Sequence, residues 1–441
     1  MNILILDPYP KKSYRISKDT SGGYGTGNDF GDSFLPKTLK KLLIKNSKWP
    51  PLFAAYTYSV LKKDRHNVVY DEELPKNYEF FDLIIIISSI VSHETEIELI
   101  KKINNKVKIF VIGPFASNNS EKYLKYNLSI IMGEPEIFFI KNKDFINFSE
   151  KKLISHDVKN FNLDELPYPE YEEMGYDLKK INNLFGRGKS IPLIATRGCP
   201  FSCFKYCVYP LQQGRKIRQR SIKGIIDEIK YWKIKYSVKN FIFRDPVFSI
   251  NRKHTVELCN ELIQEKININ FIAETHLNIL DSDLIKLLKK AGLTGIKVGI
   301  ESFDEEVIQE ANRHTATKDD QLKKIRELER NKIQVSAMFI LGFPADNPKT
   351  VMQTINYAKK LNTTYAQFSV WTPYPGTPVF FEYKDRIITN KMEDFDQYRL
   401  VFKHNVFSKE EIRYYLDKAY SNYYSRLKWV FKYIFSKNAI Y

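Results

Sequence analysis

The stretch from Thr196 to Pro210, TRGCPFSCFKYCVYP, contains three of the four cysteines of this 441-residue chain. Cys199, Cys203 and Cys207 are spaced four residues apart, so three thiolates on one loop can face one cavity. They are too few and too close together for a disulfide framework, and a reducing compartment would keep them as thiols. The stretch therefore predicts metal or redox chemistry.

A long series of alternating strands and helices begins just before the cysteines. We expect its strands at 192–196, 241–244, 270–274, 295–300, 335–341 and 367–372. We expect helices in the gaps, for example at 223–233, 254–265 and 284–291. Six consecutive βα units indicate a partial (β/α)6 barrel, whose catalytic groups lie at the carboxyl ends of the strands. Cys199 stands at the end of the first strand.

The first 140 residues show a βα rhythm of their own. Strands are predicted at 3–6, 67–70, 83–88, 108–113 and 128–132. Helices are predicted at 51–63 and 94–102. Nearly apolar strands separated by helices indicate a parallel sheet that is covered on both faces and binds ligands at its carboxyl edge. The fold class is therefore α/β, with an N-terminal flavodoxin-like, doubly wound parallel sheet followed by the barrel.

The glycine-rich segment SGGYGTGNDFG, at 21–31, does not match a dinucleotide-binding fingerprint. It begins well after the first strand, and Phe30 stands where a third glycine is needed after Gly25 and Gly27. We expect a flexible loop over the sheet edge that folds over a ligand.

Four regions follow from these patterns. We expect a ligand-binding domain at 1–145, a polar linker at 146–190, the barrel at 191–385 and a helical C-terminal region at 386–441. From Ser408 onward the tail is aromatic and basic. It is interpreted either as a helix packed on the barrel or as a surface that meets a membrane or a lipidic substrate.

The composition indicates a globular protein of the cytoplasm. The net charge of +17 arises from 69 Lys and Arg against 52 Asp and Glu, but lysines occur along the whole chain, so we expect no nucleic-acid partner. The longest apolar run, at 83–91, has about half the length of a membrane-spanning helix. The N-terminus has neither a basic region nor a signal cleavage site.

The cysteines themselves favour an iron–sulfur cluster over zinc. A tetrahedral zinc site needs a fourth Cys or His, whereas His156 and His254 are distant in sequence and Cys259 lies in a predicted helix. A cubane can use three cysteines and leave one iron open to a ligand.

The cysteine stretch resembles the cluster loop of radical S-adenosylmethionine (SAM) enzymes. The whole chain is similar to their cobalamin-binding subgroup, in which a cobalamin domain precedes the barrel. The first part carries the pieces WPPLFAAYTYSVLKKDRHNVVYDEE, FDLIIIISSI, VIGPFAS and IMGEPE. The barrel carries FIFRDPVFSINRK, FIAETHLN, GLTGIKVGIES, FILGFPADNPKTVMQTINYAKKL and YPGTP. The resemblance covers roughly residues 1–400.

The cysteine spacing departs from that family. Its usual pattern is CxxxCxxC, whereas this loop is CxxxCxxxC, with Tyr206 still preceding the last cysteine. One extra residue adds up to about 3.5 Å of chain, which we expect a local bulge to absorb. We expect the cluster to form; the alternative is a degenerate site that has lost it.

The resemblance implies three cofactors: a [4Fe-4S] cluster, SAM and cobalamin. Cys199, Cys203 and Cys207 would hold three irons, and SAM would chelate the fourth. An electron from the cluster would break SAM to give a 5′-deoxyadenosyl radical, and cobalamin would deliver methyl to the activated carbon. No D-x-H-x-x-G stretch is present, so no histidine is expected as the lower ligand of cobalt.

The resemblance also implies site residues. Asp245 and Glu274, at the ends of the second and third barrel strands, are candidates for catalytic contacts. The candidates for the SAM site are Tyr206, Glu301, Ser302 and Arg313. The candidates around cobalamin are Ser88, Ser89, Gly113, Pro114, Gly133 and Glu134. Each polar residue has a purely structural role as its alternative.

The leading interpretation is a cobalamin-dependent radical SAM enzyme that methylates an unactivated carbon. A cyclisation or rearrangement enzyme with the same cofactors, and a regulatory protein that binds cobalamin or the cluster without catalysis, are the alternatives. The substrate is a small molecule, a lipid or a peptide. Flavodoxin or ferredoxin is the expected electron donor.

Overall fold

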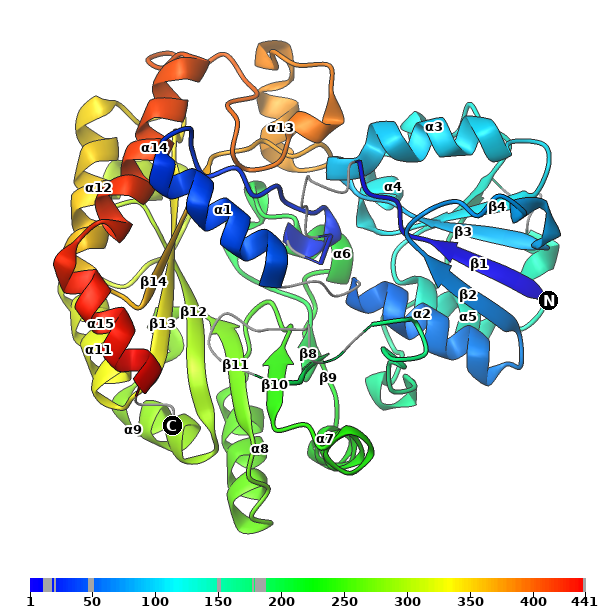
Figure 1. The fold of residues 1–441 in the computed structure, drawn as a ribbon, viewed down its shortest axis with the longest axis horizontal. Helices are drawn as coiled ribbons and strands as arrows, with labels where there is room; N and C mark the ends of the chain where they lie inside the picture. Colours follow the sequence, from blue (N-terminus) through cyan, green and yellow to red (C-terminus); the bar gives the residue numbers. More distant parts are fainter. Residues whose placement is uncertain are drawn as a thin grey trace.

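The computed structural model describes residues 1–10, 18–19, 21–46, 51–148, 152–176, 178 and 188–438. Its two large parallel sheets stand side by side (Figure 1). The first sheet, at the right of the figure, has the order β2-β1-β3-β4-β5-β6. Its strands are β1 (Asn2–Leu6), β2 (Asn67–Asp71), β3 (Leu83–Ile87), β4 (Lys108–Ile112), β5 (Ser129–Ile131) and β6 (Leu153–Ile154). This is the expected flavodoxin-like order, which reverses direction at β1 and β3.

Strand β3, with the sequence LIIII, is entirely buried because both faces of its sheet are covered. Alternate residues point to opposite faces of a strand. Ile85 and Ile87 pack in the same core as helix α2 (Leu52–Lys63), whereas Ile84 and Ile86 pack in the core that contains α3 (His93–Ile103). The short helices α4 (Pro114–Asn118) and α5 (Pro135–Lys141) follow β4 and β5. Strand β6 lies in the segment that was expected to be a linker.

The second sheet is the open barrel at the left of Figure 1, with the order β14-β13-β12-β11-β10-β7. Its parallel strands are β7 (Ser190–Leu193), β10 (Asn240–Phe243), β11 (Asn270–Thr275), β12 (Leu293–Glu301), β13 (Gln334–Leu341) and β14 (Tyr365–Val370). The main helices between them are α7 (Ile222–Tyr236), α8 (Arg252–Gln264), α9 (Ser282–Lys290), α11 (Lys318–Arg330) and α12 (Pro348–Leu361). Short helices are α6 (Tyr209–Gln213), α10 (Glu305–Glu310) and α13 (Pro378–Glu382). The six-stranded partial barrel is confirmed.

The first barrel strand is shorter than expected. β7 ends at Leu193, and a separate two-stranded antiparallel ladder of β8 (Thr196–Arg197) and β9 (Arg218–Gln219) follows it. The cysteine loop connects these two short strands, so both ends of the loop are fixed next to each other.

The C-terminal region packs on the barrel through α14 (Lys409–Tyr424), which is followed by α15 (Leu427–Asn438). The hydroxyl of Tyr420 accepts from the Phe368 amide (3.1 Å) and donates to the Phe368 carbonyl (2.9 Å). Tyr424 bonds the backbone of Ala366 in the same way. These tyrosine hydroxyls form hydrogen bonds with backbone amides and carbonyls on the open edge of β14, which would otherwise be free to pair with a strand of another chain. The side chains after 432 lie outside the described part of the tail.

Residues 21–31 are not a free loop. Tyr24 is fully buried, with its ring 5.5 Å from those of Phe115 and Tyr374, and its hydroxyl donates to the Pro375 carbonyl (2.9 Å). The segment therefore packs between the first sheet and the barrel. The next helix, α1 (Phe34–Asn46), contacts α14 on the barrel side, as Figure 1 shows.

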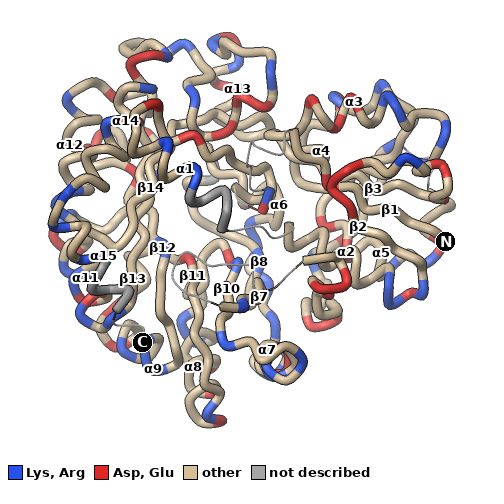
Figure 2. Tube along the Cα trace, viewed as in Figure 1, with Lys and Arg blue, Asp and Glu red and all other residues tan. Residues whose placement is uncertain are grey.

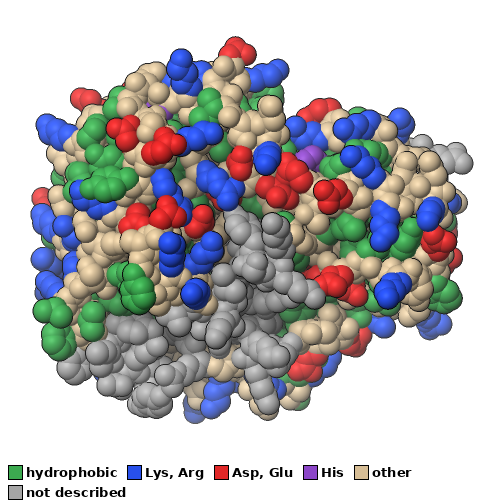
Figure 3. All heavy atoms as spheres, turned by 45° about the horizontal axis from the view of Figure 1, so that its top comes forward, with side chains coloured by type: hydrophobic (Ala, Val, Ile, Leu, Met, Phe, Trp, Pro, Cys, Tyr) green, Lys and Arg blue, Asp and Glu red, His purple; other side chains and the backbone are tan. Residues whose placement is uncertain are grey.

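Charged residues of both signs are interspersed over both sheets and their helices (Figure 2). On the face shown in Figure 3, hydrophobic side chains form small groups among the charged ones. Among the described residues, no helix combines the length and hydrophobicity needed to cross a bilayer.

Candidate functional site: the cysteine loop and the adjoining cleft

The extra residue of the cysteine loop is accommodated by helical geometry. A 3-10 turn spans Ser202–Lys205, and the Cys207 amide donates to the Cys203 carbonyl (3.0 Å). Side chains four residues apart on a helical turn lie on one face, and the thiols of Cys203 and Cys207 are hydrogen-bonded to each other. The bulge expected from the sequence is therefore replaced by a turn that brings two of the three thiols together.

One of these thiols is poised as a thiolate. The hydrogen bond from Cys207 and the Arg313 guanidinium, whose Nη1 lies 3.6 Å from the sulfur, lower the pKa of Cys203 to about 6 against burial. The pKa of Cys207 is raised by the same shared hydrogen bond and by burial. Burial also raises the pKa of Cys199. Because the thiolate is the metal-binding form, Cys203 is prepared for ligation.

The three cysteines fit a cluster better than a single ion. Within the described ranges, no three Cys, His, Asp or Glu side chains converge closely enough to hold one metal ion. A cubane distributes its thiolates over separate irons, so three thiols on one loop suffice. Cys199 and Cys203 are each only 6% exposed, which suits a cluster shielded from water. Cys259 is fully buried in α8, on a different element.

Glu301 and Arg313, both expected at the SAM site, form a buried ion pair next to Cys203. The Glu301 Oε1 and Arg313 Nη2 atoms are 3.0 Å apart. Glu301 has a φ of 66° at the end of β12, a costly conformation for a non-glycine residue. The space for the ion pair requires Gly299, because a Cβ there would lie 2.5 Å from both charged groups. Burial raises the pKa of Glu301, and Arg313 opposes the shift.

Tyr206 and Ser302 differ in what they offer a ligand. The Tyr206 hydroxyl is buried and has no hydrogen-bond partner among the described residues. The Ser302 hydroxyl is used internally, since it contacts the Thr354 hydroxyl (3.2 Å) and accepts from the Asp304 amide (3.2 Å). Tyr206 therefore fits the expected ligand contact, and the hydroxyl of Ser302 does not.

The two expected catalytic carboxylates are also placed differently. Asp245 is buried and accepts hydrogen bonds from the Ala195 amide (3.2 Å) and from the amide and hydroxyl of Thr196 (hydroxyl 2.7 Å). It fixes the break between β7 and β8, just before Cys199, so the geometry makes it a positioning residue. Burial raises its pKa to about 6. Glu274 is half-buried at the end of β11, and its carboxylate is not consumed in this way.

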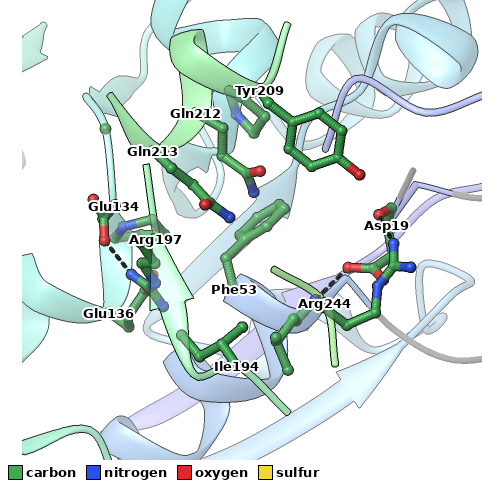
Figure 4. A pocket seen from close by; sticks show the side chains of 14 residues that line it. Asp19, Phe53, Glu134, Glu136, Ile194, Arg197, Tyr209, Gln212, Gln213 and Arg244 are labelled. Carbon is green, nitrogen blue, oxygen red and sulfur yellow. Dashed lines mark hydrogen bonds and ion pairs between the residues drawn. The ribbon is translucent and has the colours of Figure 1, made fainter. Parts of the chain in front are cut away.

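A narrow cavity of about 30 Å³ lies between the first sheet and the barrel (Figure 4). Gly133, Glu134 and Pro114 line it from the first sheet, and Phe53 lines it from α2. The opposite wall consists of the α6 residues Tyr209, Gln212 and Gln213, with Arg197 and Arg244 below them. Helix α6 begins two residues after Cys207, so the cysteine loop leads directly into the cavity wall.

Of the residues expected around cobalamin, only Pro114, Gly133 and Glu134 face this cavity. A Cβ on Gly133 would meet no atom within 4 Å, so the chain leaves open space there. Three others are used internally. Ser88 accepts from the Ala116 amide (3.0 Å), Ser89 bonds the Ser92 hydroxyl (2.8 Å), and Gly113 packs against Ser88, which a Cβ would approach to 2.9 Å.

Comparison with known proteins identifies the barrel. Residues 193–358 match the sequence profile of the Radical SAM superfamily. The barrel is a radical SAM domain. An uncharacterized methyltransferase of Pyrococcus horikoshii is 26% identical, and the alignment covers 88% of this chain and 90% of the relative. The bacteriochlorophyllide d C-8(2)-methyltransferase of Chlorobaculum tepidum is 25% identical, with coverages of 86% and 87%.

Solved structures share the fold over most of the chain. The methyltransferase TsrM of Kitasatospora setae, solved with cobalamin and a [4Fe-4S] cluster, has a TM-score of 0.62 at 14% identity, over 87% of this chain and 74% of that one. The cobalamin-dependent enzyme OxsB, solved with aqua-cobalamin and SAM, has a TM-score of 0.66 at 12% identity, with coverages of 95% and 66%. Both likenesses extend well beyond the residues that match the Radical SAM profile.

The radical SAM domain is joined to the first sheet by buried charges that the sequence did not reveal. Arg197 forms ion pairs with Glu134 and with Glu136 (2.6 Å), and Arg218 pairs with Glu134. The quoted pieces TRGCPFSCFKYCVYP and IMGEPE contain Arg197, Glu134 and Glu136, but a single sequence gives no sign that these residues meet.

A second bridge involves Asp19, whose carboxylate lies 2.6 Å from Arg244 Nε and accepts from the Leu52 amide (3.1 Å). It ties β10 of the radical SAM domain to the start of α2. Both bridges border the cavity of Figure 4.

Proposed function

We propose that this chain is a cobalamin-dependent radical SAM enzyme that methylates a carbon atom of a small-molecule substrate. One observation carries the proposal: the three-cysteine loop leads within two residues into α6, which faces Gly133 and Pro114 at the carboxyl edge of the flavodoxin-like sheet. Ligands of such sheets bind at this edge. A cluster site and a corrin site on either side of one short helix can serve the same substrate.

The residues divide into three groups by what they would hold. Cys199, Cys203 and Cys207 would bind the cluster. Tyr206, Glu301 and Arg313 would bind SAM, because the ion pair and the free phenol match its amino, carboxylate and ribose groups. Pro114, Gly133 and Glu134 would border cobalamin. When bound, the cluster supplies the electron that cleaves SAM, and cobalamin supplies the methyl carrier.

The chain's own contribution is to orient these groups and to exclude water. Asp245 and the β8–β9 ladder fix the loop that carries the cysteines. Arg313 contributes, after the hydrogen bond from Cys207, to lowering the pKa of Cys203, and it pairs with Glu301. Two relatives that align over 88% and 86% of this chain are named methyltransferases, which favours methyl transfer. The relatives named anaerobic magnesium-protoporphyrin IX monomethyl ester cyclases align over at most 53% of it. Flavodoxin or ferredoxin remains the proposed electron donor.

Anaerobic reconstitution with iron, sulfide and hydroxocobalamin tests the proposal. With a reductant and SAM, we expect both 5′-deoxyadenosine and S-adenosylhomocysteine. A rearrangement enzyme would make 5′-deoxyadenosine without S-adenosylhomocysteine. A regulatory protein would make neither, and either result would contradict the proposal.

Gly133→Asn tests the cobalamin site. The φ of Gly133 is 80°, a region that Asn tolerates better than other side chains, and the new amide would project into the open space beside the cavity. We expect the dissociation constant of hydroxocobalamin to rise at least about tenfold, a loss of about 1.4 kcal/mol. Absorbance titration measures it.

Gly175→Asn is the matched control. Gly175 also has a positive φ, 86°, and open space at its Cβ, but it does not line the cavity. It should bind cobalamin as the unsubstituted protein does. Equal affinities for both variants would contradict the assignment. Gly113 is unsuitable for this test, because a side chain there would press on Ser88 and disturb the fold.

We also propose that the C-terminal helix α15 makes peripheral contact with a membrane. Leu427 and Phe431 are 73% and 59% exposed, and the neighbouring Lys428 is exposed as well. Exposed apolar side chains beside lysines are typical of helices that bind anionic lipid surfaces. Co-sedimentation with anionic vesicles, with and without Phe431→Ser, measures this contact.

A further inference from the structure

The interior of the barrel contains charged side chains. In β12, Ile296, Val298 and Ile300 are buried in the core shared with the helices, so Lys297 and Gly299 face the barrel interior. Barrel interiors are normally filled by layers of branched apolar side chains. Here the interior positions are half-buried in β12 and β14, whereas the alternate, helix-facing positions are buried. The interior face is therefore accessible, as a substrate chamber requires.

One layer of this interior carries most of the charge. Lys297 is paired in register with Glu274 on β11 and with Ser336 on β13. Below this layer, Ile242 and Ile272 form a small apolar cluster with Tyr365 against it. Above it, Glu301 lies four residues further along β12, a rise of about 13 Å. A small molecule resting on the charged layer would lie beneath the residues assigned to SAM.

Of the two cationic side chains Arg244 and Lys297 in the interior, Lys297 is the one that forms no direct ion pair among the described residues. Arg244, which also faces the interior, is neutralised by Asp19. No carboxylate among the described residues forms an ion pair with the Lys297 ammonium, although Lys297 is half-buried. Burial and the charge of Arg244 lower the pKa of Lys297, and Glu274 opposes them. A partly desolvated ammonium that no carboxylate contacts directly favours an anionic ligand.

The charged layer also adjoins the cavity between the sheets. Tyr209 and Arg244 line that cavity, and Glu274 and Arg244 both act on the pKa of Tyr209, which burial and Glu274 raise. A molecule anchored on Lys297 would therefore lie close to the cavity that borders the proposed cobalamin site.

We propose that Lys297 anchors an anionic group of the substrate, a carboxylate or a phosphate, in the interior of the barrel. Glu274 stands beside it to accept a hydrogen bond from a neighbouring hydroxyl or amine of the same molecule. This assignment of a substrate class rests on the proposed function, and it makes Lys297 the residue that selects acidic substrates.

The first test measures anion binding without catalysis. Thermal unfolding of the reconstituted protein is followed with and without inorganic phosphate or acetate at matched ionic strength. A ligand that binds the folded state raises the midpoint. We expect at least one anion to raise it in the unsubstituted protein and in Lys286→Met, a control at an exposed lysine of α9, and Lys297→Met to lose that rise. Equal rises in all three proteins, or none in any, would overturn the proposal.

The second test identifies the anion. The reconstituted protein is incubated with a small-molecule extract of the source cells and SAM carrying a deuterated methyl group, and labelled products are found by mass spectrometry. The product should be retained by an anion exchanger, and loss of retention after phosphatase treatment distinguishes a phosphate from a carboxylate. A neutral or cationic product would overturn the proposal.

The variants complete this test. Lys297→Met should lower the ratio of labelled product to 5′-deoxyadenosine at least tenfold, and Lys297→Arg should restore part of it. An unchanged ratio in Lys297→Met would contradict the anchor. If the unsubstituted protein forms no 5′-deoxyadenosine, the proposed function fails, and the thermal test still decides whether Lys297 binds an anion.

Discussion

A Cys203→Ala variant, reconstituted anaerobically, should show no cubane absorbance and should form no 5′-deoxyadenosine above the level of protein without iron. The reason is that Cys203 holds the central position of the three cysteines. It shares a hydrogen bond with Cys207, and Arg313 stabilises its thiolate. Removing it leaves two protonated thiols and an unpaired guanidinium where a third ligand is needed. Iron analysis and absorbance near 400 nm measure the loss.

Cys259→Ala is the control for this experiment. Cys259 is more deeply buried than the loop cysteines, but it lies in α8, and burial raises its pKa to about 12, which favours the thiol. The substitution removes one buried atom and should cost about 1 kcal/mol of stability. Loss of the cluster in Cys259→Ala, with retention in Cys203→Ala, would overturn the assignment of ligands.

The fold was predictable where local sequence decides it. The run LIIII of β3 is apolar at every position, and only a strand covered on both faces accommodates that pattern. The break between β7 and β8 was not predictable, because Asp245, about fifty residues away, creates it by binding the amides of Ala195 and Thr196. Strand β6 was missed because two residues in a polar segment carry no periodic signal.

The site was predictable in its motifs but not in its contacts. The cysteines, Glu301 and Arg313 were expected in one site. Of these, Cys203 contacts Arg313, and Arg313 pairs with Glu301. Ser88 and Asp245 sit at strand ends, as ligand-binding residues do, yet their side chains bond backbone amides of distant segments. A sequence shows that a residue stands at the end of a strand. It does not show whether the side chain of that residue is hydrogen-bonded within the protein and therefore unavailable to a ligand.

Replacing Arg197 by leucine should destabilise the protein by about 3–5 kcal/mol, the usual result of breaking a buried ion pair from one side. Arg197 lies between Glu134 and Glu136, and the three side chains are 5% exposed or less. In the leucine variant the Glu136 carboxylate stays buried but loses the ion pair with Arg197. Glu134 keeps only its ion pair with Arg218. Because Arg197 is two residues before Cys199, the loss would also loosen the cysteine loop. Urea unfolding measures the free energy.

A surface ion pair provides the control. Lys223 and Asp227 on α7 are 2.5 Å apart, but Lys223 is 84% exposed. Lys223→Met should therefore change the free energy of unfolding by less than about 0.5 kcal/mol. A similar cost for both variants would mean that burial of the Arg197 cluster has no energetic consequence.

The pH dependence shows whether the cost comes from the buried charge. Burial raises the pKa of Glu136 in the folded protein, and Arg197 opposes that shift, so the leucine variant should raise the pKa further. When the pKa of a carboxyl is higher in the folded protein than its unfolded value, near 4.3, the folded state binds the proton more tightly. The free energy of unfolding then decreases as the pH rises from the unfolded pKa through the folded pKa. The deficit of Arg197→Leu should therefore be smaller at pH 5 than at pH 7, and adding Glu136→Gln should reduce it at pH 7. A deficit that is the same at both pH values, and unchanged by Glu136→Gln, would show that Arg197 acts through packing and not through charge.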